Sequence, residues 1–181
     1  MLRRRLLGSI SLPFLVACGG GGGGSPTNPP PPSPPVPGTA SFTVSSAAGS
    51  QRITYSDQGG NLIFCRPGGA RFFIRLARDR GGDGAGGPHI DIDICGTVTS
   101  GSYPPTDPRV PCPTGQAWDV FWHDEAGATF VNDSQSSSCR LDLIRTGTVL
   151  DGMFTCDALK ELNGTRTLNI HTGSFHCSEG S

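Results

Sequence analysis

The sequence predicts an all-β domain, an antiparallel β-sandwich or, as the alternative, a small β-barrel, with at most one short helix. Three observations lead to this class. Short runs of alternating apolar and polar residues recur from residue 39 onward. Turn signals rich in glycine, proline, asparagine and aspartate separate these runs. Six cysteines are spread over the same region and can cross-link a small exported domain.

The first strands are expected between residues 39 and 77. Alternation with polar residues marks the runs around Phe42 and Tyr55, and a turn at 57–60 leads into the run that holds Leu62 and Phe64. Pro67, Gly68 and Gly69 then reverse the chain. The next run, 71–77, places three apolar side chains on one face: Phe72, Ile74 and Leu76.

Residues 89–95 show the strictest alternation in the chain. Ile90, Ile92 and Ile94 are expected to face the core. The opposite face then carries three polar side chains: His89, Asp91 and Asp93. A solvated polar face is the expectation for these three, and a divalent-metal site is the alternative. Because ligands at i, i+2 and i+4 are about 7 Å apart per step, an ion would need a side chain from a neighbouring strand.

The second half of the chain begins with a proline-rich passage, 96–117, which excludes a central strand. A strand is expected at 118–123, with Trp118, Val120 and Trp122 on one side, and a short one at 129–132. Residues 157–162 resemble a helix of a turn or two, which Asp157 would cap. The sequence therefore predicts at most one short helix among many strands.

The spacing of Cys139 and Cys156 predicts a hairpin. If Gly147 and Thr148 form a two-residue type II′ turn, the two cysteines face each other in a non-hydrogen-bonded pair, where Cα atoms approach to about 4.5 Å. A disulfide fits that separation. The same register sorts the apolar residues onto one face: Leu141, Leu143, Leu150 and Phe154. Slipping by one residue would scramble both patterns.

The other four cysteines allow three connectivities. Cys95 and Cys112 flank the proline-rich passage, so a local bridge between them is expected. Cys65 and Cys177 would then join an early strand to the last one. A zinc site of cysteines is disfavoured because no C-x-x-C pair occurs.

The N-terminus carries an export pattern. Three arginines precede a short apolar run that ends at Leu15, Val16, Ala17 and Cys18, and six glycines follow. These four residues resemble the lipobox of bacterial lipoproteins, in which the cysteine is acylated and becomes the new N-terminus. The resemblance implies a membrane anchor at Cys18. An aspartate directly after the cysteine resembles the inner-membrane retention signal of enteric bacteria, but this chain has Gly19 at that position. The resemblance therefore also implies the outer membrane of a bacterial cell envelope.

The organisation that follows is a signal peptide at 1–17, a lipidated cysteine with a glycine- and proline-rich linker at 18–38, and one domain at 39–181. Without residues 1–17 the chain holds 11 basic and 15 acidic residues, a net charge of about −4. Nucleic acid is therefore not an expected partner, because phosphate binding needs a basic surface. The expected partners are the membrane, through the anchor, and an envelope protein or polysaccharide.

The sequence contains no recognisable catalytic motif and implies no cofactor. Two further groups are weak site candidates. Asp79 and Asp83, in a glycine-rich loop, could offer oxygen ligands to calcium. The polar run His123, Asp124 and Glu125 follows an aromatic strand and is expected to form an exposed turn, while Trp118 and Trp122 are candidates for the core or for carbohydrate stacking.

A short repeat, Gly-x-Phe-x-Cys, occurs at 152–156 and 173–177. It loosely resembles the ends of uncharacterised β-rich envelope lipoproteins, a likeness that carries no activity with it. The function expected from the whole sequence is a membrane-anchored, non-enzymatic binding or structural module. An exported hydrolase with loop-borne carboxylates is the alternative.

Overall fold

The computed structural model describes residues 37–57, 61–78, 87–133 and 135–180. The predicted signal peptide, Cys18, nearly all of the linker, and the pair Asp79 and Asp83 lie outside these residues. Within them the chain forms strands and connecting turns with no α-helix, so none of the described residues forms a helix long and apolar enough to cross a membrane.

The described residues form eleven strands in succession. They are β1 (Thr39–Ser46), β2 (Gly49–Ser56), β3 (Asn61–Gly68), β4 (Arg71–Arg78), β5 (His89–Cys95), β6 (Gly101–Tyr103), β7 (Ala117–His123), β8 (Thr129–Val131), β9 (Ser138–Thr146), β10 (Val149–Glu161) and β11 (Thr167–Ser178). All of these strands pair antiparallel.

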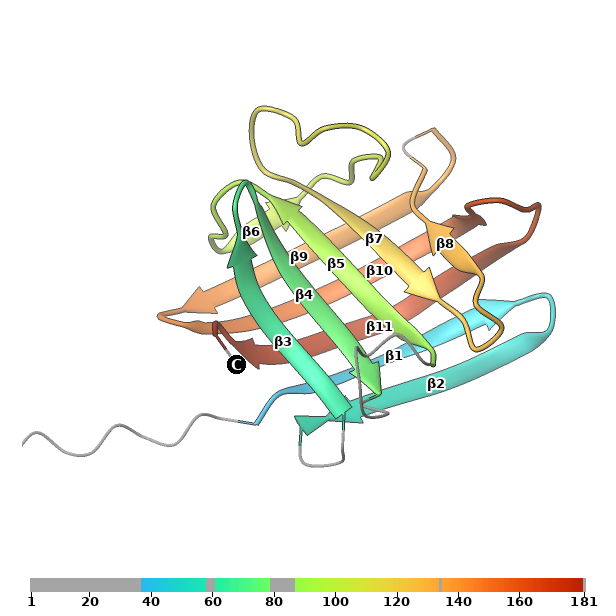
Figure 1. The fold of residues 1–181 in the computed structure, drawn as a ribbon, viewed down its shortest axis with the longest axis horizontal. Helices are drawn as coiled ribbons and strands as arrows, with labels where there is room; N and C mark the ends of the chain where they lie inside the picture. Colours follow the sequence, from blue (N-terminus) through green and yellow to red (C-terminus); the bar gives the residue numbers. More distant parts are fainter. Residues whose placement is uncertain (1–36, 58–60, 79–86, 134, 181) are drawn as a thin grey trace, which may run out of the picture. The chain divides into compact units, whose positions relative to one another are not determined.

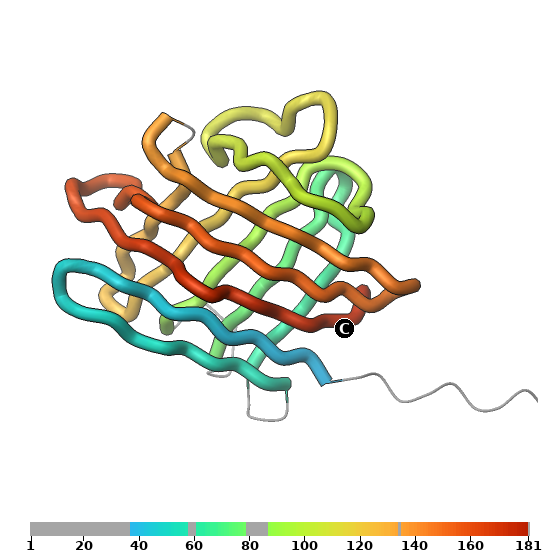
Figure 2. The backbone as a smooth tube through the Cα atoms, turned by 180° about the vertical axis from the view of Figure 1, so that it is seen from behind, coloured from blue at the N-terminus to red at the C-terminus, as the bar shows by residue number. Residues whose placement is uncertain are grey.

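The strands form one sheet that nearly closes into a barrel. Its order is β2-β1-β11-β10-β8-β7-β5-β4-β3, with β9 paired to β10 and β6 to β9. Figure 1 shows β3, β4, β5 and β7 crossing over a second layer of β1, β2, β9, β10 and β11, and Figure 2 shows that second layer from behind. The all-β class is confirmed, and of the two predicted architectures the nearly closed sheet corresponds to the barrel.

The disulfide between Cys65 and Cys177 lies where the barrel closes. It joins β3, one edge of the strand order, to β11, with the Cα atoms 6.1 Å apart. The backbone N–H of Gly180 also donates to the carbonyl of Cys65 at 2.9 Å. Cys95 is bonded to Cys112 and Cys139 to Cys156, with Cα separations of 5.5 and 4.0 Å. The structure thus contains the three predicted disulfides.

The predicted hairpin is confirmed residue by residue. β9 pairs with β10 so that Thr146 lies opposite Val149 and Cys139 opposite Cys156. Gly147 has the positive φ of +63° that the first position of a type II′ turn requires. The apolar residues of both strands are buried, as the register predicts: Leu141, Leu143, Leu150 and Phe154.

The Gly-x-Phe-x-Cys repeat has a structural explanation. Its two copies lie side by side on β10 and β11, with Gly152 opposite Phe175 and Phe154 opposite Gly173. Each phenylalanine therefore covers the glycine across from it. A Cβ atom built on Gly152 would lie 2.2 Å from the ring of Phe175, and one on Gly173 would lie 2.6 Å from the ring of Phe154. Both positions need glycine because the opposing ring occupies the space.

The helix predicted at 157–162 is wrong, because β10 continues to Glu161. A bulge interrupts the pairing after Cys156, and Ala158 has a φ of +57°. The extra residue changes which side chains face inward, so that Cys156 and Leu159 are both fully buried. The Ala158 N–H donates to the Asn169 side chain at 2.8 Å, which replaces the interrupted ladder. Strand pairing thus overrides a local helical preference.

Aromatic side chains fill the barrel. The ring of Phe42 lies 5.6 Å from Trp122 and 5.9 Å from Phe154, and so connects the two layers. Trp118 and Tyr55 are also buried, at 0% and 1% exposure. The two tryptophans are therefore core residues, and a carbohydrate-stacking role for them is excluded by their burial. Packed side chains therefore occupy the interior of the barrel within the described residues.

Candidate functional site

The candidate site lies on the outer face of four neighbouring strands, β7, β5, β4 and β3. Inward residues of these strands fill the barrel, so the alternate residues face outward. The pairing registers align the outward residues in rows across the strands. One row consists of Phe121, Asp91, Arg75 and Phe64. Four strands between residues 61 and 123 thus contribute to one surface.

This face is hollowed, with an open volume of about 950 Å³. Its lining combines aromatic rings with charged groups. Chief among these residues are Phe64, Phe73, Phe121, Arg66, Arg75 and Asp93, and the end of the hollow is formed by the histidines described below. Concave sites that mix apolar surface with a few placed polar groups are typical of ligand binding.

Arg75 and Asp91 form a two-point ion pair across β4 and β5. The Arg75 Nε donates to Asp91 Oδ1 at 2.6 Å and Nη2 donates to Oδ2 at 2.8 Å. These hydrogen bonds raise the pKa of Arg75 above its ordinary value. The Arg75 guanidinium also lies 5.8 Å from the ring centre of Phe64, and that of Arg66 lies 4.9 Å from the same ring. Asp91 is therefore held in a fixed orientation.

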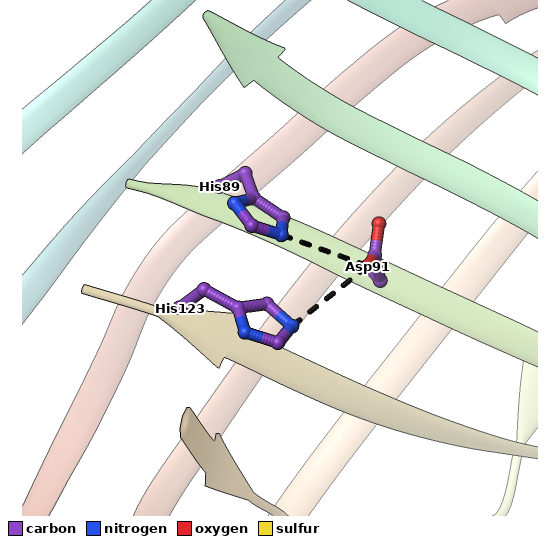
Figure 3. Close-up of side chains that lie close together, drawn as sticks. All are labelled: His89, Asp91 and His123. Atoms are coloured by element: carbon purple, nitrogen blue, oxygen red, sulfur yellow. Dashed lines mark ion pairs between the residues drawn. The ribbon is translucent and has the colours of Figure 1, made fainter. Parts of the chain in front are cut away.

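His89 and His123 stack beside this ion pair. They lie opposite each other on β5 and β7, with ring centroids 4.1 Å apart and planes 13° from parallel. Figure 3 shows that both rings turn an edge toward Asp91. Each Nε2 is 3.9 Å from Asp91 Oδ2. Burial, followed by the neighbouring His89, lowers the pKa of His123, which favours its neutral form.

Asp93 belongs to a different group. It pairs with Arg71 at 3.4 Å, and Arg71 also binds Asp119 at 2.8 Å. Asp119 has a fully buried side chain, and its Oδ1 has no hydrogen-bond partner. Burial and the charge of Asp93 raise the pKa of Asp119 to about 6. Burial likewise raises the pKa of Asp93.

The structure brings together part of each predicted polar group. His89 and Asp91 lie in one cluster, but the third member is His123 of β7 and not Asp93, whose carboxylate is held by Arg71. The expected solvated face is also corrected for His89, which is only 9% exposed. Asp124 and Glu125 line the same hollow.

Sequence reasoning missed the outward aromatic and arginine residues. Phe64, Phe121 and Arg75 occur in strands that were recognised as strands, but only the pairing of β3, β4, β5 and β7 shows that they meet. Asp119 was also missed. It stands between Trp118 and Val120, where its outward position could be read from the alternation but its burial could not.

The chain matches no protein-family model and shows no significant similarity to a curated protein or to a solved structure.

Proposed function

We propose that this chain is a bacterial cell-envelope lipoprotein, anchored through Cys18, whose barrel binds a small ligand in the hollow on its outer face. The observation that carries the binding role is the contrast between a barrel interior filled by aromatic side chains and an outer face with an ordered row of rings and ion pairs. A face that served only to contact solvent would not need three phenylalanines in a hollow.

The three disulfides support export. Such bonds form and persist in oxidising compartments such as the periplasm, and they are rare in the cytosol. The lipobox-like residues ending at Cys18 and the glycine- and proline-rich linker supply the anchor and the tether of the proposal. Several acyl chains together hold a protein on a membrane more firmly than one does. The outer membrane is the proposed location.

The anchor is tested by changing Cys18 to Ala and fractionating the cells. The wild-type chain should be found in the outer-membrane fraction, and the variant should stay unprocessed or move to the soluble fraction. Gly24→Ala, six residues further along in the glycine tract, is the matched control and should behave as the wild type. An acylated, membrane-bound Cys18→Ala variant would refute the anchor.

The ligand site is tested with Arg66, which is exposed above the Phe64 ring. The immobilised full-length chain is incubated with envelope polysaccharide and protein fractions, and the retained material is compared between variants. Arg66→Ala should lose a component that the wild type retains. Arg52→Ala, an exposed arginine on β2 away from the hollow, is the matched control and should retain it. Equal retention by both variants, or none by the wild type, would contradict a site in the hollow.

An exported hydrolase is the alternative function, and one observation favours it. Asp93 and Asp119 are neighbouring carboxylates with raised pKa values, as general acids often have. However, the Asp119 side chain is fully buried and does not line the hollow, so it cannot contact a substrate there. The geometry therefore supports a binding module better than an enzyme that uses these two groups.

A further inference from the structure

Three potential metal ligands converge at one end of the hollow. His89 and Asp91 are two residues apart on β5, which places them on the same face, and the register of β5 with β7 adds His123 directly beside His89. One donor atom from each of the three lies within 4.8 Å of the others. Figure 3 shows an edge of each imidazole turned toward the Asp91 carboxylate, and the space between the three donor atoms is the candidate ion position.

The hydrogen bonds of the imidazoles orient their Nε2 atoms into this space. The Nδ1 of His89 lies 2.9 Å from the carbonyl oxygen of Gly87, which can only accept, so Nδ1 carries a proton and Nε2 is the nitrogen that offers a lone pair in the neutral ring. The Nδ1 of His123 is 3.0 Å from the hydroxyl of Thr129. Metal-bound histidines characteristically bond through one ring nitrogen to the metal and through the other to a carbonyl, carboxylate or water.

The imidazoles and the carboxylate lie close together without a direct hydrogen bond between them. Each Nε2 is 3.9 Å from Asp91 Oδ2, which is longer than a hydrogen bond. In the neutral form of the ring, the lone pair on His89 Nε2 and the lone pairs of Asp91 Oδ2 face each other, and a cation between them would be attracted by both. Asp91 keeps its orientation because Arg75 holds both of its oxygens, which is the usual support for a ligating carboxylate.

The separations suit a transition-metal ion after a small adjustment. Zinc binds nitrogen and oxygen at about 2.0 to 2.2 Å, so tetrahedral ligand atoms lie about 3.3 Å from one another. Side-chain movements of about half an ångström would bring the two 3.9 Å separations to this value, and the separation between the two histidine nitrogens, at most 4.8 Å, would close by up to about 1.5 Å. Two histidines and one carboxylate are a ligand set found in sites that keep open positions for water or a ligand. These open positions would face the hollow, beside Phe121 and Asp124.

We propose that His89, Asp91 and His123 bind a divalent transition-metal ion of the zinc class, with the open coordination positions directed into the hollow. The metal would hold an anionic or neutral donor group of a ligand whose apolar part lies against the phenylalanines. The ion site itself requires neither the anchor at Cys18 nor the identity of that ligand. Its failure would thus leave the tests of the proposed function intact.

The test is a titration of the full-length chain with zinc alone. The chain carries Cys18→Ala, because the other six cysteines are in disulfides and this change removes the remaining thiol. Calorimetry should show one zinc ion per chain, and cobalt(II) should give visible absorption bands that zinc removes. His123→Gln and Asp91→Asn should each weaken the affinity by more than about 100-fold, since even loss of a supporting contact costs 10- to 100-fold.

His171→Gln is the matched control, because His171 is a histidine of β11 that faces a single carboxylate, Asp157. It should leave the affinity unchanged. A measurement on the chain without site mutations guards against a misfolded variant: zinc should protect His123, whose side chain is 28% exposed, from diethyl pyrocarbonate and leave His171 reactive. Absence of saturable binding, unchanged binding by a folded His123→Gln variant, or no zinc protection of His123 would overturn the site.

Discussion

Replacing Asp119 by asparagine should stabilise the barrel at neutral pH. The carboxylate is fully buried, with Oδ2 accepting a hydrogen bond from Arg71 at 2.8 Å and Oδ1 without a partner. Burial, together with the charge of Asp93, outweighs the attraction of Arg71 and raises the pKa of Asp119 from 3.8 to about 6. The native state therefore disfavours the ionised form, and asparagine removes the charge with little change in shape.

The magnitude follows from the two pKa values. Each pKa unit between the native and the unfolded state corresponds to about 1.4 kcal/mol, so ionised Asp119 destabilises the native state by about 3 kcal/mol relative to its protonated form. Because the native state binds this proton more tightly, the contribution of Asp119 to stability is fully present below pH 3.8 and is lost as the pH rises through about 6. The gain from Asp119→Asn should therefore grow between pH 4 and pH 7.

Urea unfolding at a series of pH values measures this difference. The free energy of unfolding of Asp119→Asn minus that of the wild type should rise by up to about 3 kcal/mol over that interval. Asp142→Asn is the control, because the hydrogen bonds from Arg140 and Ser102 lower the pKa of Asp142 and give its pH dependence the opposite sign. A difference for Asp119→Asn that does not change with pH would refute the reasoning.

Two further predictions concern the barrel itself. Replacing Cys65 and Cys177 together by serine should lower the free energy of unfolding by about 5 kcal/mol, and the same change at Cys139 and Cys156 by about 3 kcal/mol. The difference arises because the first disulfide closes a loop over a sequence separation of 112 residues and the second over 17. Urea unfolding of the two double variants measures both losses, and a larger loss for Cys139 and Cys156 would contradict the prediction. Gly152→Ala should destabilise the native state by about 1–3 kcal/mol, because the added Cβ would meet the Phe175 ring. Met153→Ala, at a residue that is 65% exposed, is the control and should be close to neutral. Equal melting temperatures for the two variants would refute the role given to the ring.

The parts of the fold that depend on neighbouring residues could be predicted from the sequence. The hairpin of β9 and β10 follows from a two-residue turn and a spacing that aligns Cys139 with Cys156, so pairing and burial are determined together. The inward faces of β5 and β7 follow from alternation in the same way. In these segments local pattern and tertiary structure favour the same answer.

Other features depend on contacts between segments far apart in the chain. The side chain of Asn169 on β11 stabilises the bulge at Ala158 through a hydrogen bond. The residue pattern within 157–162 does not predict this bulge. Closure of the sheet into a barrel similarly requires β3 to meet the end of β11, as the disulfide between Cys65 and Cys177 records. Both outcomes are set by tertiary pairing, which outweighs weak local preferences.

The sequence predicts only part of the cluster on the outer face. Alternation placed His89, Asp91 and Asp93 on one face, and strand geometry required a ligand from a neighbour. The side chain that lies beside His89 is His123, and only the register of β5 with β7 places it there. Asp93 does not belong to this cluster, because its carboxylate pairs with Arg71 at the start of β4.

Nitrogen-15 NMR of the histidine side chains tests the site on the outer face most directly. The chain has four histidines, so their ring signals can be assigned with His→Gln variants. We expect the metal-free His89 to be protonated at Nδ1, as its contact with the Gly87 carbonyl requires, and zinc to shift the Nε2 signals of His89 and His123 together. Zinc-induced shifts confined to His171 and His176, or a His89 protonated at Nε2 alone, would contradict the account.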